Sequence, residues 1–409
     1  MSRLLQICNL IKINMPIALP VLGAGSAFIL NLIMKSQLSS ESYGGFAAAL
    51  FSVAILYMIA GLGFEQVLVR LSTVSGDSLI LDRSIVVATI SVIIISPAFC
   101  SVVMMMFGVI DYVDVNLIVM AIVISASILF STLYKIQGNI LSHYLFLHAW
   151  KIFLLLMVVV GFISDLRFQD YATTIYTAVI AAFIVSLLIS PFKNIKIKTI
   201  VSDDSLIVFT IAGLVSVMSF SVFDGLDRIL VGELFNRSVF GDYFFIFAFL
   251  ISPVGIVSSY ISAKRLKLYK QNFNLSNFKS DYFYTLAISL LIASVFAIAL
   301  DALVRFGFII LTKDYYSIMA VVFLLAVVRG GYGMLSLAYS VLCSSRILIL
   351  VGLFFASMSV AVFYFITGLM PSNYLALHDI GIVILALWIF RSYFYWFLIG
   401  YSFKEGRLI

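Results

Sequence analysis

Long apolar runs with few charges constrain the fold of this chain more than any other feature of its sequence. A helix needs about 20 residues to cross the hydrocarbon core of a bilayer, and runs of that length recur throughout the 409 residues. They lie near 11–34, 45–68, 84–108, 115–136, 145–164, 172–191, 206–232, 240–262, 283–303, 315–341, 347–368 and 380–402. The sequence therefore predicts an all-α polytopic membrane protein with about twelve transmembrane helices.

The composition supports this class and excludes others. The chain is 63% hydrophobic, against roughly 45–50% for soluble domains. The first run follows Arg3 and is too long for a signal peptide, so we expect it to be retained. The net charge of +6 comes from loops that flank the runs, so nucleic acid is not an expected partner. Three isolated cysteines, histidines five apart at 143 and 148, and the lack of a P-loop motif predict no metal and no cofactor.

Lysine and arginine are distributed unequally between alternate loops. With a cytoplasmic N-terminus, sixteen basic residues lie in inside segments and only four, Lys35, Arg167, Arg237 and Lys313, in outside segments. Basic residues in short loops mark the cytoplasmic side. The sequence therefore predicts that both termini are cytoplasmic.

An internal repeat divides the chain. The segment Asn31–Gly44, which we call the first elbow, has the same length as Arg228–Gly241, the second elbow, 197 residues later. Each elbow ends in an aromatic residue followed by glycine. Such self-similarity indicates two parallel copies of one six-helix unit, although any two hydrophobic hairpins have some likeness. We predict an N-terminal lobe, 1–200, and a C-terminal lobe, 201–409, related by a pseudo-two-fold axis along the membrane normal.

Charged residues inside the runs are candidate functional groups, because each is costly in a bilayer. Asp224 and Arg228 are four residues apart and can pair on one helix face. Together with Asp227 they form either a local ion pair or a coupling and gating cluster. Glu65, near the inner end of the second run, is a further coupling or gating candidate, although a side chain that snorkels to the interface is the alternative.

Three cations lie deep within predicted helices: Arg329, Arg391 and Lys151. If they face inward they would line a cationic cavity suited to a diphosphate, which guanidinium groups bind in bidentate fashion. The alternative is that each pairs with a carbonyl or an acid to hold helices together. Arg70, at the cytoplasmic end of the second run, could bind a substrate headgroup or ordinary lipid phosphate.

Short motifs resemble those of one transporter family. The segment Gly61–Arg70 looks like a glycine-rich, arginine-ending segment of polysaccharide-repeat flippases. Their seventh-helix signature resembles Asp227–Gly232 followed by Phe240–Tyr243. Two turns are also similar: Lys135–Gly138 and Thr312–Tyr315. The chain thus resembles the O-antigen flippases (Wzx type) of the multidrug, oligosaccharidyl-lipid and polysaccharide exporter superfamily.

This resemblance implies a MATE-like fold and a transport function. It implies two six-helix lobes around a central cavity and alternating access, with H⁺ or Na⁺ as the coupling ion. The implied substrate is an undecaprenyl-diphosphate-linked oligosaccharide, moved across the bacterial inner membrane during lipopolysaccharide O-antigen biosynthesis. Membrane lipids and a glycan polymerase are the implied partners, and the chain would not be an enzyme.

Two other functions are open at this point. A membrane glycan polymerase or ligase would usually carry a large outside loop, whereas every predicted outside loop here is short. A multidrug-type exporter of the same superfamily would need an acidic or aromatic cavity for organic cations, whereas the three deep cations favour an anion.

Overall fold

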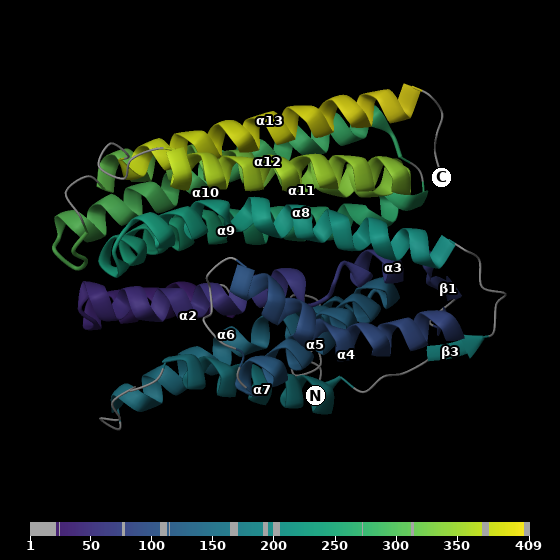
Figure 1. Ribbon diagram of the computed structural model, residues 1–409, viewed down its shortest axis with the longest axis horizontal. Helices are drawn as coiled ribbons and strands as arrows, with labels where there is room; N and C mark the ends of the chain where they lie inside the picture. The colour runs from purple at the N-terminus through teal and green to yellow at the C-terminus, as the bar shows by residue number, and fades with distance from the viewer. Residues whose placement is uncertain are drawn as a thin grey trace, which may run out of the picture. The chain divides into compact units, whose positions relative to one another are not determined.

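The computed structural model describes residues 22–23, 25–75, 78–106, 113, 115–163, 171–190, 195–198, 205–271, 273–311, 315–369 and 376–404. Residues 25–37 are helical. The helices that follow are α2 (Ser40–Ile59), α3 (Phe64–Leu71), α4 (Arg83–Met106), α5 (Val115–Gln137), α6 (Ile140–Ile163), α7 (Tyr171–Ile189), α8 (Ser205–Leu234), α9 (Arg237–Gln271), α10 (Leu275–Arg305), α11 (Tyr315–Leu342), α12 (Ser345–Leu369) and α13 (Leu377–Lys404). The all-α prediction is confirmed for the described residues, apart from one small sheet (Figure 1).

Membrane-spanning character follows the predicted runs closely. Within the described residues, ten helical segments are long and apolar enough to cross a bilayer. The first predicted run lies mostly outside the described residues, and the seventh forms the 30-residue helix α8. Large apolar side chains are exposed on several of these helices, among them Ile94, Leu188 and Ile298. Such exposure is unfavourable in water but suits a surface that faces lipid.

The chain divides into two compact units. The first unit comprises Met1–Leu30 and Ala48–Ser221, and the second comprises Asn31–Ala47 and Val222–Ile409. The second unit therefore contains the first elbow, although that elbow belongs to the N-terminal half of the sequence. Helix α8 begins in the first unit and continues into the second.

A three-stranded sheet, which the apolar runs did not predict, lies in the first unit. It has the order β1-β2-β3, with β1 (Thr73–Ser75) antiparallel to β2 (Ser78–Asp82) and β2 parallel to β3 (Ile195–Lys198). The sheet thus ties the segment after α7 to the loop after α3. Leu79 and Leu81 of β2 pack into a buried cluster with Phe64 of α3 and Leu129 of α5.

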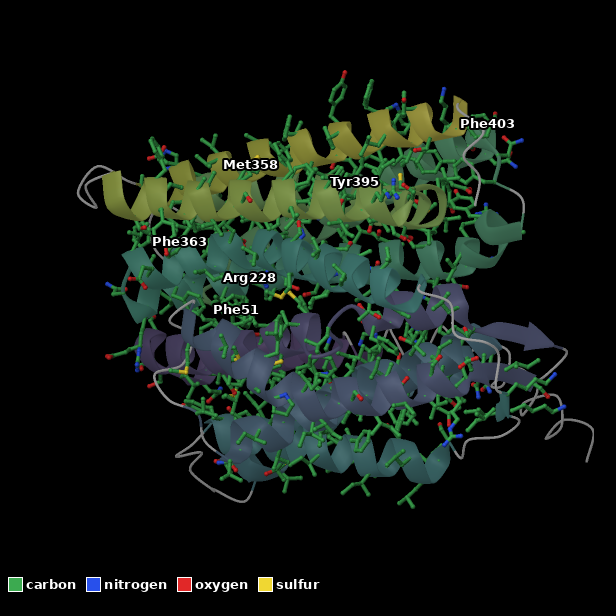
Figure 2. The ribbon with its side chains drawn as sticks, turned by 45° about the vertical axis from the view of Figure 1, so that its right-hand side comes forward. Phe51, Arg228, Met358, Phe363, Tyr395 and Phe403 are labelled. Atoms are coloured by element: carbon green, nitrogen blue, oxygen red, sulfur yellow. The ribbon has the colours of Figure 1, made fainter. Side chains whose placement is uncertain are left out.

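In the second unit, α11 is packed against α9, α10 and α13. Ser258 of α9 donates a hydrogen bond to the carbonyl oxygen of Gly330 on α11 at 2.6 Å. Small residues allow this close approach of two helices, which in a membrane is a main source of association. The contact fixes the middle of α11, including Arg329, next to α9. Figure 2 shows side chains filling the spaces between these helices, with Arg228 and Tyr395 among them.

The two elbows pack directly against each other within the second unit. Lys35 Nζ lies 2.5 Å from Asp242 Oδ1, and both side chains are almost fully buried. Tyr43 donates to Asn31 Oδ1 at 2.9 Å, and Lys35 lies over the Tyr43 ring. The loop charges assigned Lys35 to an outside segment. In the structure its side chain is buried and holds the first elbow against the residue that follows the second.

Corresponding residues of the repeat touch at this contact. Gly44 and Gly241 occupy equivalent positions, and a Cβ built on Gly241 would lie 3.1 Å from Gly44 Cα. A Cβ on Gly44 would overlap the backbone carbonyl of Arg237. Equivalent residues meet each other where two copies are arranged about a two-fold axis. The contact leaves no room for a side chain at position 44 and little at position 241.

We expect Gly44→Ala to lower thermal stability, because its methyl group would meet backbone that cannot move aside. Overpacking of this kind costs about 1–3 kcal/mol. Gly45→Ala is the matched control: the next residue of the same helix has nothing within 4 Å of its Cβ. Replacing glycine by alanine inside a helix stabilises the folded protein by up to about 1 kcal/mol. The two unfolding midpoints, measured in the same lipid, should move in opposite directions; equal midpoints would contradict the close contact.

Candidate functional site: a buried guanidinium cluster

An ion pair on α8 begins the candidate site. Arg228 Nη2 lies 2.9 Å from Asp224 Oδ2 and 2.5 Å from the Asp224 carbonyl oxygen. The two residues are four apart, so one helical turn brings them onto the same face. The pairing predicted from the spacing is therefore present in the structure.

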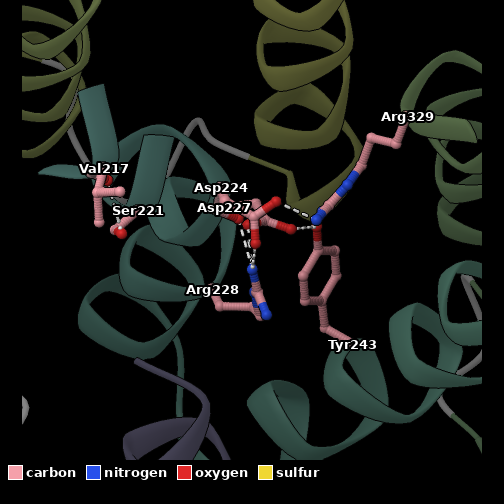
Figure 3. A network of polar contacts seen from close by, with 7 residues as sticks. All are labelled: Val217, Ser221, Asp224, Asp227, Arg228, Tyr243 and Arg329. Atoms are coloured by element: carbon pink, nitrogen blue, oxygen red, sulfur yellow. Dashed lines mark hydrogen bonds and ion pairs between the residues drawn. The ribbon is translucent and has the colours of Figure 1, made fainter. Parts of the chain in front are cut away.

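Asp224 also binds a residue 105 positions later in the chain. Its other carboxylate oxygen, Oδ1, accepts a hydrogen bond from Arg329 Nη2 of α11. One carboxylate thus bridges two guanidinium groups (Figure 3). The sequence assigned Arg329 to substrate and Asp224 to gating, whereas the structure joins them in one network.

Asp227 completes this network on the same helix. Tyr243 of α9 donates to Asp227 Oδ2 at 2.7 Å, and Arg228 Nε lies 3.4 Å from Asp227 Oδ1. The side chains of Asp224, Asp227 and Arg228 are at most 5% exposed, while that of Arg329 is 15% exposed. Arg329 is therefore the member of the cluster that a ligand could most readily reach.

Aromatic rings cover the faces of these guanidinium groups. Arg329 lies over Phe247 at 5.1 Å and over Trp388 at 4.9 Å from the ring centroids. Arg228 lies 4.3 Å from the centroid of the same Phe247 ring. Cation–π contacts of this kind are worth about 0.5–2 kcal/mol each, with the larger values in desolvated sites. The rings hold the charged groups in fixed planes without neutralising them.

Arg391 of α13 is also surrounded by aromatic rings. It is buried among Phe223, Phe355, Tyr332 and Tyr395, whose ring centroids lie 4.6–5.4 Å from its Cζ atom. Its Nη2 donates to Tyr395 Oη at 3.2 Å. Trp388 packs edge-on against Phe223 and Tyr332, so it lies between the aromatic surroundings of Arg329 and those of Arg391.

Arg329 leaves one donor of the cluster without an acceptor. Two carboxylates, Asp224 and Asp227, balance the guanidinium groups of Arg228 and Arg329. Arg329 Nη1, however, is buried and has no hydrogen-bond partner among the described residues. A buried donor on a charged group is costly unless an acceptor meets it. An anionic ligand would supply that acceptor.

The other predicted site residues lie elsewhere. Lys151 of α6 belongs to the first unit, where its Nζ lies 5.7 Å from the centroid of the Trp150 ring. Glu65 of α3 also belongs to the first unit. Arg70 is in the last turn of α3, and its side chain lies outside the described residues. The described contacts thus unite Arg329 with Asp224, Asp227 and Arg228, but they do not join Lys151 or Glu65 to that cluster.

Sequence reasoning missed the aromatic residues of the site. Trp388, Arg391 and Tyr395 are spaced by three and four residues, and Tyr332 follows Arg329 by three. These spacings put each aromatic on the same helix face as an arginine. That signal was present in the sequence, but in a chain with 15% aromatic residues it does not stand out.

Comparison with known proteins identifies the fold. No protein-family model and no curated protein matches the chain. A solved structure described as an outward-facing multidrug resistance MATE family transporter of the MOP superfamily is similar, with a TM-score of 0.62 and 14% identity over 96% of each chain. A second, a crystal structure of MATE in complex with MaD3S, has a TM-score of 0.52 and 14% identity, again over 96% of each chain.

The chain is therefore a multi-pass membrane protein with the fold of MATE transporters, and the predicted fold class is confirmed. At 14% identity the similarity to these structures is one of fold, so the substrate has to be argued from the residues of this chain.

Replacing Asp224 by Asn should destabilise the protein strongly. The change leaves Arg228 and Arg329 buried without their shared counter-charge, and removing one partner of a buried ion pair typically costs 3–5 kcal/mol. The exposed pair between Asp301 and Arg305 on α10 provides the control, and Asp301→Asn should leave the midpoint nearly unchanged. Unfolding midpoints in a common lipid test this. Equal small effects of the two variants would contradict the bridging role of Asp224.

Proposed function

We propose that this protein translocates an undecaprenyl-diphosphate-linked oligosaccharide across the bacterial inner membrane by ion-coupled alternating access. The observation that carries the proposal is the buried Nη1 donor of Arg329, which has no hydrogen-bond partner among the described residues. Arg329 and Arg391 both lie on helices suited to crossing a membrane, where ionised side chains are costly and mark a pathway. The MATE-type fold supports a transporter, and both termini are proposed to be cytoplasmic from the loop charges.

The chemistry of arginine favours a diphosphate over other anions. A guanidinium group presents a planar fork of donors that matches phosphate oxygens and stays charged at any physiological pH. Arg329 uses Nη2 for Asp224 and has Nη1 without a partner among the described residues. In this proposal a phosphate oxygen binds Nη1, while the rings of Phe247 and Trp388 keep the guanidinium plane in position.

Arg329→Ala and Arg391→Ala should each reduce translocation at least tenfold. The expected size follows from losing a charge-assisted hydrogen bond, worth about 1.5–3 kcal/mol, since 1.4 kcal/mol corresponds to a factor of ten. The assay is movement of a fluorescent undecaprenyl-diphosphate oligosaccharide between the leaflets of proteoliposomes. Arg305→Ala, at the exposed end of α10, is the matched control and should transport normally.

Protein yield and unfolding midpoint must accompany this assay, because the arginines also have structural contacts. Arg329→Lys keeps the charge but loses the fork, and we expect transport intermediate between wild type and Arg329→Ala. Normal transport by both alanine variants would refute the proposed diphosphate site.

A multidrug-type exporter is the second candidate. One of the similar structures is described as a multidrug resistance transporter, and the buried carboxylates of Asp224 and Asp227 could attract an organic cation. Efflux of a fluorescent organic cation from cells distinguishes the two functions. The exporter would be favoured if the wild type did not translocate the glycolipid and if the Arg391→Ala variant still exported the organic cation.

A further inference from the structure

The strand β3 of the small sheet has apolar and basic residues in alternation. Its sequence is Ile-Lys-Ile-Lys from Ile195 to Lys198, and successive side chains of a strand point to opposite faces. In the parallel pairing with β2, Ile195 is level with Leu79 and Ile197 is level with Leu81. The isoleucines therefore lie on the face of the sheet that carries these leucines, and the lysines lie on the other face.

The face with the isoleucines packs on the membrane helices of the first unit. Leu79 and Leu81 are buried in a cluster with residues of α3, α4 and α5, and Ile195 packs against the same cluster. Ile197 lies on this face too, yet it is 58% exposed. Its side chain therefore extends beyond the protein core on the side of the sheet where the membrane helices lie, which suits contact with lipid.

The sheet lies where the membrane-spanning helix α4 begins. β2 ends at Asp82 and α4 starts at Arg83, with no residue between them, and Figure 1 shows β3 beside this end of α4. Val87, Ile90 and Ile94 of α4 are 54–69% exposed, and their spacing of three and four residues puts them on one face of the helix. Arg83, four residues before Val87, is exposed at the end of this apolar face. The sheet is therefore at the level of the lipid headgroups.

Three exposed basic side chains lie at this edge: Arg83, Lys196 and Lys198. None of the ion pairs among the described residues involves them. Asp82 is level with Lys198 in the strand pairing, but its Oδ1 atom accepts hydrogen bonds from the backbone N–H and the hydroxyl group of Ser84, both at 2.7 Å. This edge therefore presents more positive than negative charge to an external anion.

A further strand is the alternative occupant of this edge. In the sheet formed by the described strands, β3 has a neighbour on one side only, so its other side offers backbone groups to an extended segment of another protein. Lysines on an edge strand are a means by which natural sheets prevent such pairing. A lipid headgroup, by contrast, combines a phosphate for the lysines with acyl chains for Ile197. The alternation therefore favours lipid.

We propose that β3 lies in the membrane interface and binds the phosphate groups of anionic phospholipids. Ile197 contacts the acyl chains, while Lys196, Lys198 and Arg83 bind headgroup phosphates. Long basic side chains reach the headgroup level in this way, because their stems are apolar and only their ends are charged. The binding surface depends on the first unit alone, so it is independent of the glycolipid proposed as substrate.

Fluorescence quenching in bilayers tests this proposal. The three cysteines of the full chain are replaced by Ser, and an NBD fluorophore is attached at Ile197→Cys. In mixed phosphatidylcholine and phosphatidylglycerol bilayers, nitroxide-labelled phosphatidylglycerol should quench this fluorophore about fivefold or more over nitroxide-labelled phosphatidylcholine, since one basic residue near an anionic surface contributes about a factor of five. Ile94→Cys, at an exposed position within α4, is the matched control and should be quenched equally by the two lipids.

Lysine variants separate charge from position. Lys196→Gln together with Lys198→Gln should remove most of the preference for phosphatidylglycerol at position 197. Lys196→Arg together with Lys198→Arg keeps the charge and should retain the preference. Molar salt should weaken it, because salt screens exposed charges. Both lysines are exposed, so the unfolding midpoints of these variants should equal that of the wild type.

Two results would overturn the proposal. Equal quenching at position 197 by the two lipids, or a preference that survives the double Gln variant, would exclude binding of the phosphates by the lysines. Absence of quenching by either lipid would place Ile197 outside the bilayer. Apolar NBD emission in that second case would assign the edge to a protein partner instead.

Discussion

The cost of keeping ionised groups away from water governs the arrangement of this protein. Taking a charge out of water costs several kcal/mol unless a partner compensates it, and the second unit buries at least six such groups: Lys35, Asp224, Asp227, Arg228, Asp242 and Arg391. Lys35 pairs with Asp242, and the other two carboxylates pair with Arg228 and with the partly buried Arg329. Asp224 is the central partner, because its two oxygens neutralise arginines from two helices. The position of α11 relative to α8 therefore depends on one carboxylate.

The same constraint explains how an elbow from the N-terminal half of the sequence becomes part of the second unit. Lys35 is too costly to bury alone, and its partner Asp242 lies just after the second elbow. The glycines at 44 and 241 let the two backbones come close enough for that pair to form. Charge pairing and close packing thus act together at this contact.

The sequence predicted the class of fold, the helical runs and the Asp224–Arg228 pair, because each follows from local periodicity or from a spacing of four residues. It could not predict that Arg329 binds Asp224, since that contact joins residues 105 positions apart. It could not predict that Lys35 is buried, for the same reason: its partner is 207 residues away. The small sheet was not predicted either, because strands of three to five residues give no periodic signal between apolar runs. The aromatic surroundings of Arg391 come from four helices and emerge only in three dimensions.

Helix α8 belongs to both units. Gly213, which packs against Gly63 in the first unit, and Asp224, which binds Arg329 in the second, lie on this one helix. Ser221 lies between them in the sequence, and its hydroxyl donates to the carbonyl oxygen of Val217 at 2.8 Å (Figure 3). A Cβ at position 213 would lie 2.6 Å from the Gly63 carbonyl oxygen, whereas the carboxylate of Asp224 neutralises two arginines. The helix is therefore held by close backbone packing in the first unit and by charge pairing in the second.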